Sequence, residues 1–202
     1  MPCANRCLRW ALVLLTAMLV TSCATHKYVL NKEYPQLSVD KEYDGILEEQ
    51  ICKCSVDGPT ERRMLIYLPK TYYESNESYP VFYLLHGARG NELSWIEKGN
   101  ILHNIDSLRA AGLMREMIVV LPNVNQYDDD IDFNKSRIKG AVESLFETDG
   151  AVETAFVSDV VNAVDSLYRT LPDKEHRAIA GLSIGAMQSM HISANAPDIF
   201  GY

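Results

Sequence analysis

Cysteine is scarce in this 202-residue chain, and its placement excludes a disulfide framework. Cys3, Cys7 and Cys23 lie near the N-terminus, which leaves only Cys52 and Cys54 in the rest of the sequence. Two cysteines at positions i and i+2 of a strand share a face, but they are too far apart and too poorly directed to bridge. A metal site on this pair is the weaker alternative, because no histidine or further cysteine lies nearby in the sequence. We expect buried thiols here, and neither a metal nor a cofactor.

Basic residues are outnumbered as well. The chain has 19 Lys and Arg against 27 Asp and Glu, a formal net charge of −8, and removal of Arg6 and Arg9 with an N-terminal signal would make it −10. A chain this acidic repels phosphate backbones, so we expect no nucleic-acid partner. The acidic run Asp128 to Asp132 lacks the glycine and final glutamate of an EF-hand loop, which favours a solvated loop over a calcium site.

Long hydrophobic runs are limited to one stretch, Trp10 to Val20, which follows Arg6 and Arg9 and is too short for a typical membrane-spanning helix. This pattern predicts an export signal over residues 1–22. Its end, Val20-Thr21-Ser22-Cys23, resembles a bacterial lipobox, in which cleavage precedes the cysteine and Cys23 carries the lipid. The alternatives are a plain secretory signal or an uncleaved anchor. We expect a lipoprotein of the bacterial cell envelope, in the periplasm or at the cell surface, held to the membrane through Cys23.

The rest of the chain divides into a polar stretch, residues 23–44, which we expect to be a tether, and a single domain over residues 45–202. Within this domain, strand patterns alternate with helix patterns, and Gly112 is placed to cap the first helix. The alternation predicts an α/β fold, a mostly parallel sheet flanked by helices. The expected strands are 46–56, 63–68, 81–85, 117–121 and one from 177, and the expected helices are 101–111 and 154–170.

The pentapeptide Gly181-Leu182-Ser183-Ile184-Gly185 lies where the last strand must turn into a helix, as in a nucleophile elbow. Such an elbow holds the serine hydroxyl clear of the backbone, and glycines two residues before and after it remove side chains that would strike the neighbouring helix and strand. Ser183 is therefore the candidate nucleophile. Gly181 and Gly185 are the motif glycines.

A second motif, Leu84 to Gly90, ends an earlier buried strand with the sequence His86-Gly87-Ala88. Its glycines let main-chain N–H groups approach an oxyanion, and the amide after the nucleophile, that of Ile184, would supply the other donor. We place the first donor in the segment Gly87–Ala88.

Histidines are few, and none lies on a loop after a later strand, where the base of a nucleophile-elbow enzyme is expected. We expect His86, beside the glycine-rich loop, to be structural. The other histidines lie in the tether, in the first helix, at the start of the serine's strand and two turns into the next helix: His26, His103, His176 and His191. The acid and the base that would activate Ser183 are thus missing from this sequence.

The domain resembles a bacterial esterase family that includes esterase D, feruloyl and acetyl-xylan esterases and enterochelin esterase-like enzymes. The resemblance rests on four segments, 79–87, 92–95, 117–123 and 177–183. It implies an α/β-hydrolase fold that is incomplete after the helix following the nucleophile, with Ser183 as nucleophile and oxyanion donors at Ala88 and Ile184. It also implies that Trp95 lines the substrate pocket, although a purely structural role for Trp95 stays open. Ala186 replaces a second glycine common in relatives, and the family's acid and histidine lie beyond residue 202.

The leading hypothesis is an exported, lipid-anchored serine carboxylesterase that cleaves acyl or feruloyl esters, carried by polysaccharides, through an acyl-serine intermediate. Two alternatives stay open. One is a catalytically inactive lipoprotein that binds a glycan or a protein partner, and the other is an esterase of siderophores or small thioesters. We also expect the strand before Ser183 to be an unpaired sheet edge.

Overall fold

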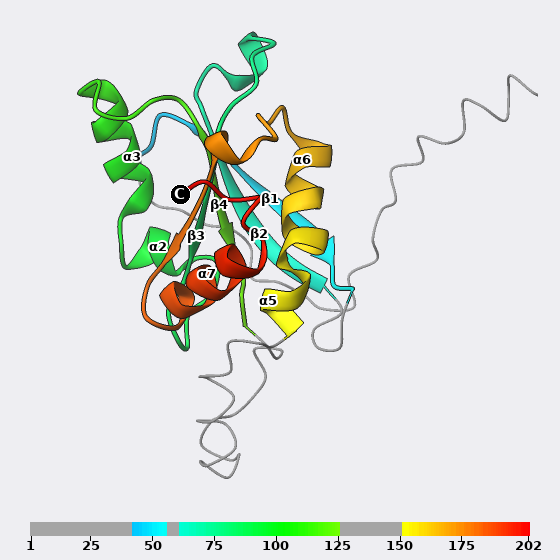
Figure 1. Cartoon of the computed structure of the whole chain (residues 1–202). Helices are drawn as coiled ribbons and strands as arrows, with labels where there is room; N and C mark the ends of the chain where they lie inside the picture. Colours follow the sequence, from blue (N-terminus) through cyan, green and yellow to red (C-terminus); the bar gives the residue numbers. More distant parts are fainter. Residues whose placement is uncertain (1–41, 56–60, 126–150) are drawn as a thin grey trace, which may run out of the picture. The chain divides into compact units, whose positions relative to one another are not determined.

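The computed structural model describes residues 42–55, 61–125 and 151–202. The predicted signal, most of the tether and the acidic run at 128–132 lie outside these residues. Within them, strands and short helices alternate along the chain (Figure 1). The strands are β1 (Ile46–Lys53), β2 (Glu61–Leu68), β3 (Val81–Leu85), β4 (Ile118–Pro122) and β5 (Arg177–Gly181). The helices are η1 (Tyr72–Glu74), α2 (Ser94–Glu97), α3 (Ile101–Ala110), α5 (Ala151–Phe156), η2 (Val157–Val161), α6 (Asn162–Leu167), η3 (Lys174–His176) and α7 (Ile184–Asn195).

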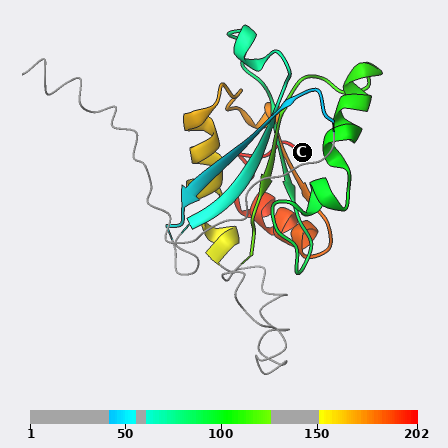
Figure 2. The same cartoon turned by 180° about the vertical axis from the view of Figure 1, so that it is seen from behind.

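The strands form one mixed sheet in the order β1-β2-β4-β3-β5. β1 pairs antiparallel with β2, and β2 pairs antiparallel with β4, while β4, β3 and β5 run parallel to one another. In Figure 2, which views the molecule from behind, the β1–β2 pair is nearest the viewer. β3 lies between β4 and β5 in the sheet, and the three strands are parallel. Their carboxyl ends therefore lie at the same edge of the sheet.

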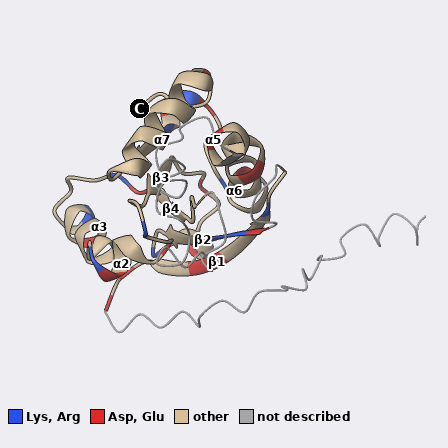
Figure 3. Ribbon diagram, turned by 90° about the horizontal axis from the view of Figure 1, so that it is seen from below, with Lys and Arg blue, Asp and Glu red and all other residues tan. Residues whose placement is uncertain are grey.

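Helices cover both faces of the sheet: α5, α6 and α7 lie on one side, and α2 and α3 lie on the other (Figure 3). This double cover explains why the central strands β3 and β4 are apolar along their whole length, since a strand covered on both faces buries both sets of side chains. In β2, the five residues from Met64 to Leu68 have no exposed surface, and all of β4 is buried. The predicted sheet flanked by helices is confirmed.

The predicted helix 154–170 differs from the observed one at both ends and in the middle. The helical segment begins at Ala151, passes through a π-helical turn at η2 and ends at Leu167. It ends early because Tyr168 is extended (φ −126°, ψ 157°) and Tyr79 forms a bridge with Thr170. The predicted cap of α3 is confirmed: Gly112 has φ 68°, and the amides of Gly112 and Leu113 donate to Arg109 and Leu108 in a Schellman motif.

The predicted unpaired edge at β5 is wrong in part. β5 is the last strand of the sheet, but the end of the chain runs beside it. The amide of Gly201 donates to the carbonyl of Arg177 (3.1 Å), and the amide of Ile179 donates to that of Tyr202 (3.0 Å). These two bonds satisfy backbone groups that the strand order alone leaves open.

Two further expectations concern thiols and membranes. Cys52 is buried, as predicted, whereas Cys54 is only half-buried, and within the described residues the two are not joined in a disulfide. In the described ranges, no helix is both long enough and apolar enough to span a bilayer.

Candidate active site

Ser183 stands on the sharp turn between β5 and α7. Its backbone has φ 56° and ψ −117°, a conformation that costs a residue with a β-carbon about 1–3 kcal/mol. Ser183 is exposed, and its carbonyl accepts the amides of Ala186 (3.0 Å) and Met187 (3.2 Å), which begin the first turn of α7. The turn thus presents the hydroxyl at the N-terminal end of a helix, outside the packed core.

The two motif glycines allow this turn by their lack of a side chain. A β-carbon added at Gly181 would lie 2.3 Å from the carbonyl carbon of Gly185, and one added at Gly185 would lie 2.4 Å from the carbonyl oxygen of His86. Both contacts are with backbone, which cannot swing aside. The spacing of the motif is therefore set by the close packing of α7 against β5 and against the end of β3.

The glycine-rich segment after β3 lies beside the elbow, as predicted. A β-carbon at Gly87 would be 3.3 Å from the carbonyl oxygen of Leu182, and the amide of Leu182 donates to the carbonyl of Leu85 (3.2 Å). Gly87 to Gly90 form a tight turn, in which the Gly90 amide donates to the Gly87 carbonyl (3.0 Å); it is called the oxyanion turn below after the role predicted for it from the sequence. Ala88 is exposed on this turn, while Ile184 occupies the first position of α7, where an amide has no acceptor within the helix.

His86 is fixed by main-chain groups and is not placed to act as a base. It is 2% exposed, and its Nε2 accepts the amide of Val124 (3.0 Å). Since Nε2 is an acceptor, Nδ1 carries the proton and donates to the carbonyl of Gly87 (2.9 Å). The ring therefore connects the end of β4 to the oxyanion turn, which supports a structural role.

The other described histidines lie on three different elements. His103 is on α3 beside Ser107, and His191 is on α7. His176 precedes β5 and pairs with Asp173, whose pKa is lowered by the hydrogen bond from His176. That pair has the composition of a catalytic dyad, but the five residues of β5, about 17 Å at 3.3 Å per residue, separate it from Ser183.

Trp95 is half-buried in α2, and its ring has structural contacts. The indole N–H donates to the carbonyl of Leu85 (3.1 Å), which is also the acceptor of the Leu182 amide. The ring packs on Gly99, where an added β-carbon would lie 2.9 Å from a ring carbon. Trp95 thus ties α2 to the end of β3, and its role in lining a substrate pocket stays a prediction.

Sequence reasoning missed a buried group of polar side chains beneath the oxyanion turn. Arg63 of β2 donates to Glu92 (3.2 Å), and Asn123, which follows β4, donates to the other oxygen of Glu92 (3.0 Å). Arg63, Glu92 and Asn123 are 1%, 4% and 9% exposed. Arg63 is also paired with Glu49 of β1 (2.8 Å). The available signal was an arginine inside an apolar strand and an asparagine at the end of another.

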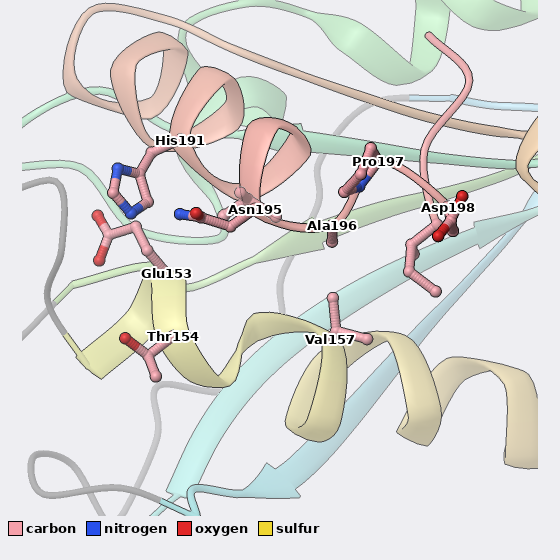
Figure 4. Close-up of a pocket in the computed structure, with 10 residues that line it drawn as sticks. Glu153, Thr154, Val157, His191, Asn195, Ala196, Pro197 and Asp198 are labelled. Atoms are coloured by element: carbon pink, nitrogen blue, oxygen red, sulfur yellow. The ribbon is translucent and has the colours of Figure 1, made fainter.

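A separate pocket of about 490 Å³ lies between α5 and the C-terminal half of α7 (Figure 4). Figure 4 shows His191 and Glu153 facing each other across one end, with Asn195 between α7 and α5. The pocket is lined by Glu153, Thr154, Val157, His191, Ile192, Asn195, Ala196, Pro197, Asp198 and Ile199. This set includes neither Ser183 nor a residue of the oxyanion turn, so the pocket is not part of the candidate active site.

Solved structures share this fold. A ferulic acid esterase superimposes with a TM-score of 0.63 at 27% sequence identity, covering 79% of this chain and 57% of its own. A ferulic acid esterase from Anaeromyces mucronatus, in complex with ferulic acid, gives a TM-score of 0.59 at 30% identity and covers 82% of this chain and 58% of its own. The fold is that of the α/β-hydrolase esterases, as the sequence predicted.

Sequence comparison gives the family. The family described as "Putative esterase" matches residues 55–202, and the chain belongs to it. An endo-1,4-beta-xylanase/feruloyl esterase of Xylanibacter ruminicola is 33% identical over 141 residues, which are 68% of this chain and 18% of that protein. The chain therefore spans about three fifths of the solved esterases and less than a fifth of this larger relative.

Proposed function

We propose that this chain carries the nucleophile and the oxyanion hole of a serine carboxylesterase. The observation that supports it is the strained backbone of Ser183, held between two glycines that pack on backbone, with the oxyanion turn beside it. Strain of this kind persists only where the surroundings over-determine it, and it is concentrated at functional sites.

In the proposed reaction, the Ser183 hydroxyl attacks the ester carbonyl carbon. The carbonyl oxygen becomes an oxyanion, which accepts hydrogen bonds from the amides of Ala88 and Ile184. Collapse of this intermediate breaks the bond to the alcohol, which leaves with a proton and gives an acyl-Ser183 ester. Water then attacks the acyl group, and the acid is released as the Ser183 hydroxyl re-forms.

A histidine must take and return these protons, and in this family's order the acid and histidine follow the nucleophile helix, after position 202. We propose that the full-length gene product supplies them.

For the substrate, we propose acyl or feruloyl esters carried by polysaccharides. The support is the similarity to a protein named xylanase/feruloyl esterase and to ferulic acid esterases, one of them bound to ferulic acid. On this basis the full-length protein should cleave methyl ferulate with a higher kcat/KM than 4-nitrophenyl acetate. The reverse order would favour a simple acyl esterase.

The test of the catalytic role compares Ser183→Ala with Ser193→Ala in the full-length gene product. Ser193 is a matched control because its hydroxyl, among the residues that the structure describes, donates to a helix carbonyl of α7, that of Met190 (3.1 Å). We expect Ser183→Ala to lower kcat by at least 10³-fold, and Ser193→Ala to leave it within twofold. A fluorophosphonate should add to Ser183 Oγ with loss of fluoride. If the protein neither hydrolyses esters nor is labelled, but still binds a feruloylated oligosaccharide, it is an inactive binding protein instead.

We further propose that the protein is exported and anchored to a membrane by lipid on Cys23. Support comes from the apolar stretch Trp10 to Val20 and the lipobox-like Val20-Thr21-Ser22-Cys23, both outside the described residues. Mass spectrometry of the mature N-terminus should find a lipidated Cys23, and Cys23→Ser should release the protein from membranes, whereas Cys7→Ser should not. An unmodified N-terminus at another position would refute the anchor.

A further inference from the structure

The oxyanion turn is held in place from outside as well as by its own hydrogen bond. Arg89, in the middle of the turn, has φ 60°, a left-handed conformation that is uncommon for residues other than glycine, asparagine and aspartate. The side-chain amide of Asn125 donates to the carbonyl of Gly90 (3.0 Å), and His86 donates to the carbonyl of Gly87 (2.9 Å). A turn with an unfavourable central residue thus has both of its end carbonyls bound by side chains.

Asn125 is itself fixed on two sides. Its main-chain amide donates to Oδ1 of Asn123 (3.0 Å), and its carbonyl accepts the guanidinium of Arg62 (2.7 Å). The amide nitrogen of Asn123 donates to Glu92, and Glu92 accepts Arg63. A continuous series of hydrogen bonds therefore runs from β2 through Arg63, Glu92, Asn123 and Asn125 to the carbonyl of Gly90. The first three residues are buried, and the half-buried Asn125 joins the series through its main-chain amide; the four residues are called the buried polar chain below.

Stability alone is a poor explanation for such an arrangement. A buried arginine and carboxylate lose so much hydration that apolar residues of the same volume often give equal or greater stability. A hydrogen-bonded series has instead one defined geometry, because each donor and acceptor fixes the orientation of the next. The series of hydrogen bonds ends at the carbonyl of Gly90, in the turn that contains Ala88.

We propose that the buried polar chain positions the oxyanion turn, so that the Ala88 amide points at the substrate oxygen before substrate arrives. Arg63, Glu92, Asn123 and Asn125 are positioning residues in this view, since none of them touches the reacting atoms. The proposal rests on the proposed esterase function for its catalytic consequence. Oxyanion donors act only in the transition state, so a misaligned turn lowers kcat and leaves KM nearly unchanged.

The lead variant is Asn125→Asp, which keeps the shape of the side chain but replaces the donor to Gly90 with an acceptor. Asn125→Ala removes the contact without adding a charge. The matched control is Asn104→Ala, because Asn104 makes the same type of bond to a main-chain carbonyl, that of Gly99 (3.1 Å), outside the buried polar chain. In the full-length protein we expect Asn125→Asp to lower kcat for 4-nitrophenyl acetate by 10- to 100-fold with KM within twofold. We expect a smaller fall for Glu92→Gln, which keeps an acceptor for Asn123.

Amide hydrogen exchange tests the positioning independently of activity. The Gly90 amide is protected by its bond to Gly87, so its exchange should accelerate more than tenfold in Asn125→Asp, while amides of β2 and β4 keep their rates. Exchange that accelerates equally across β2 and β4, or a kcat unchanged with Gly90 still protected, would overturn the proposal. If the wild type cleaves no ester, the proposed function fails, and the Gly90 exchange rate alone decides whether the buried polar chain holds the turn.

Discussion

Gly185 of the nucleophile helix packs directly on the carbonyl of His86, so closely that an added β-carbon would lie 2.4 Å from that oxygen. This contact joins the two halves of the candidate site, because Gly185 follows the proposed nucleophile Ser183 and His86 precedes the oxyanion turn. The helix can approach β3 this closely only without a side chain at position 185.

Gly185→Ala should destabilise the protein by about 1–3 kcal/mol or more, since backbone on both sides must move to admit the methyl group. Chemical denaturation measures this loss. Gly112→Ala is the comparison, because no atom lies within 4 Å of a β-carbon there and only the positive φ is unfavourable, at a cost of about 1–2 kcal/mol. Equal losses for the two variants would show that α7 can shift away from β3 at little cost.

The strain at Ser183 predicts an order of stability among its variants. Ser183→Gly should be more stable than Ser183→Ala by roughly 1 kcal/mol, because glycine adopts φ 56° without a steric penalty. Both variants lack the hydroxyl, so the difference isolates the backbone term. Thermal unfolding measures the order, and a less stable Ser183→Gly would mean that the elbow is not strained.

Trp95→Phe separates the two roles left open for Trp95. Loss of the indole N–H leaves one hydrogen bond fewer on the Leu85 carbonyl and should cost about 1 kcal/mol in unfolding free energy. If Trp95 also lines the substrate pocket, KM for methyl ferulate should rise at least threefold while KM for 4-nitrophenyl acetate stays the same. An unchanged KM for both esters assigns Trp95 to structure alone.

Asp165→Asn tests whether the carboxylate of Asp165 has a structural role. Asp165 accepts the buried guanidinium of Arg177 (2.7 Å) and the hydroxyl of Thr170 (2.8 Å) at the start of β5, away from Ser183. Because Asp165 is 25% exposed, we expect a loss of about 1–3 kcal/mol, less than for a fully buried pair. The kcat of the full-length protein should stay within twofold, and the exposed Asp198→Asn should change neither property. A large fall in kcat for Asp165→Asn would contradict the structural role.

Cys52 should make the fold less stable at high pH. Burial is the main cause that raises the pKa of the Cys52 thiol from 9.0 to about 12. Because the folded-state pKa is the higher one, this contribution to stability is complete below pH 9 and is lost between about pH 9 and pH 12. Urea denaturation at pH 8 and pH 10 should therefore show a smaller loss of stability in Cys52→Ala than in the wild type. Equal losses in the wild type and Cys52→Ala would refute the shift.

The local chemistry of the site could be predicted from the sequence, because it depends on residues close together in the chain. The spacing of Gly181, Ser183 and Gly185 predicts a tight strand-to-helix turn, and the structure has one there. Gly112 likewise ends α3 as predicted. The end of the helix before β5 could not be predicted, since Tyr168 leaves the helix through packing and bridging partners about 90 to 120 residues away, such as Tyr79 and Glu48.

The sequence by itself determined the elbow, the glycine-rich turn and the alternation of strands and helices, since backbone conformation and hydrophobic periodicity act over a few residues. Only the tertiary structure decided which polar side chains support the turn. Arg63, Glu92 and Asn123 follow one another at intervals of about 30 residues in sequence, and they meet because the sheet order β2-β4-β3 places β2 beside the segments that follow β4 and β3. The tautomer of His86 was decided in the same way, by a main-chain amide 38 residues further along the chain. Hydrogen bonds between distant segments form only once the sheet is assembled, and for that reason no local sequence pattern predicts them.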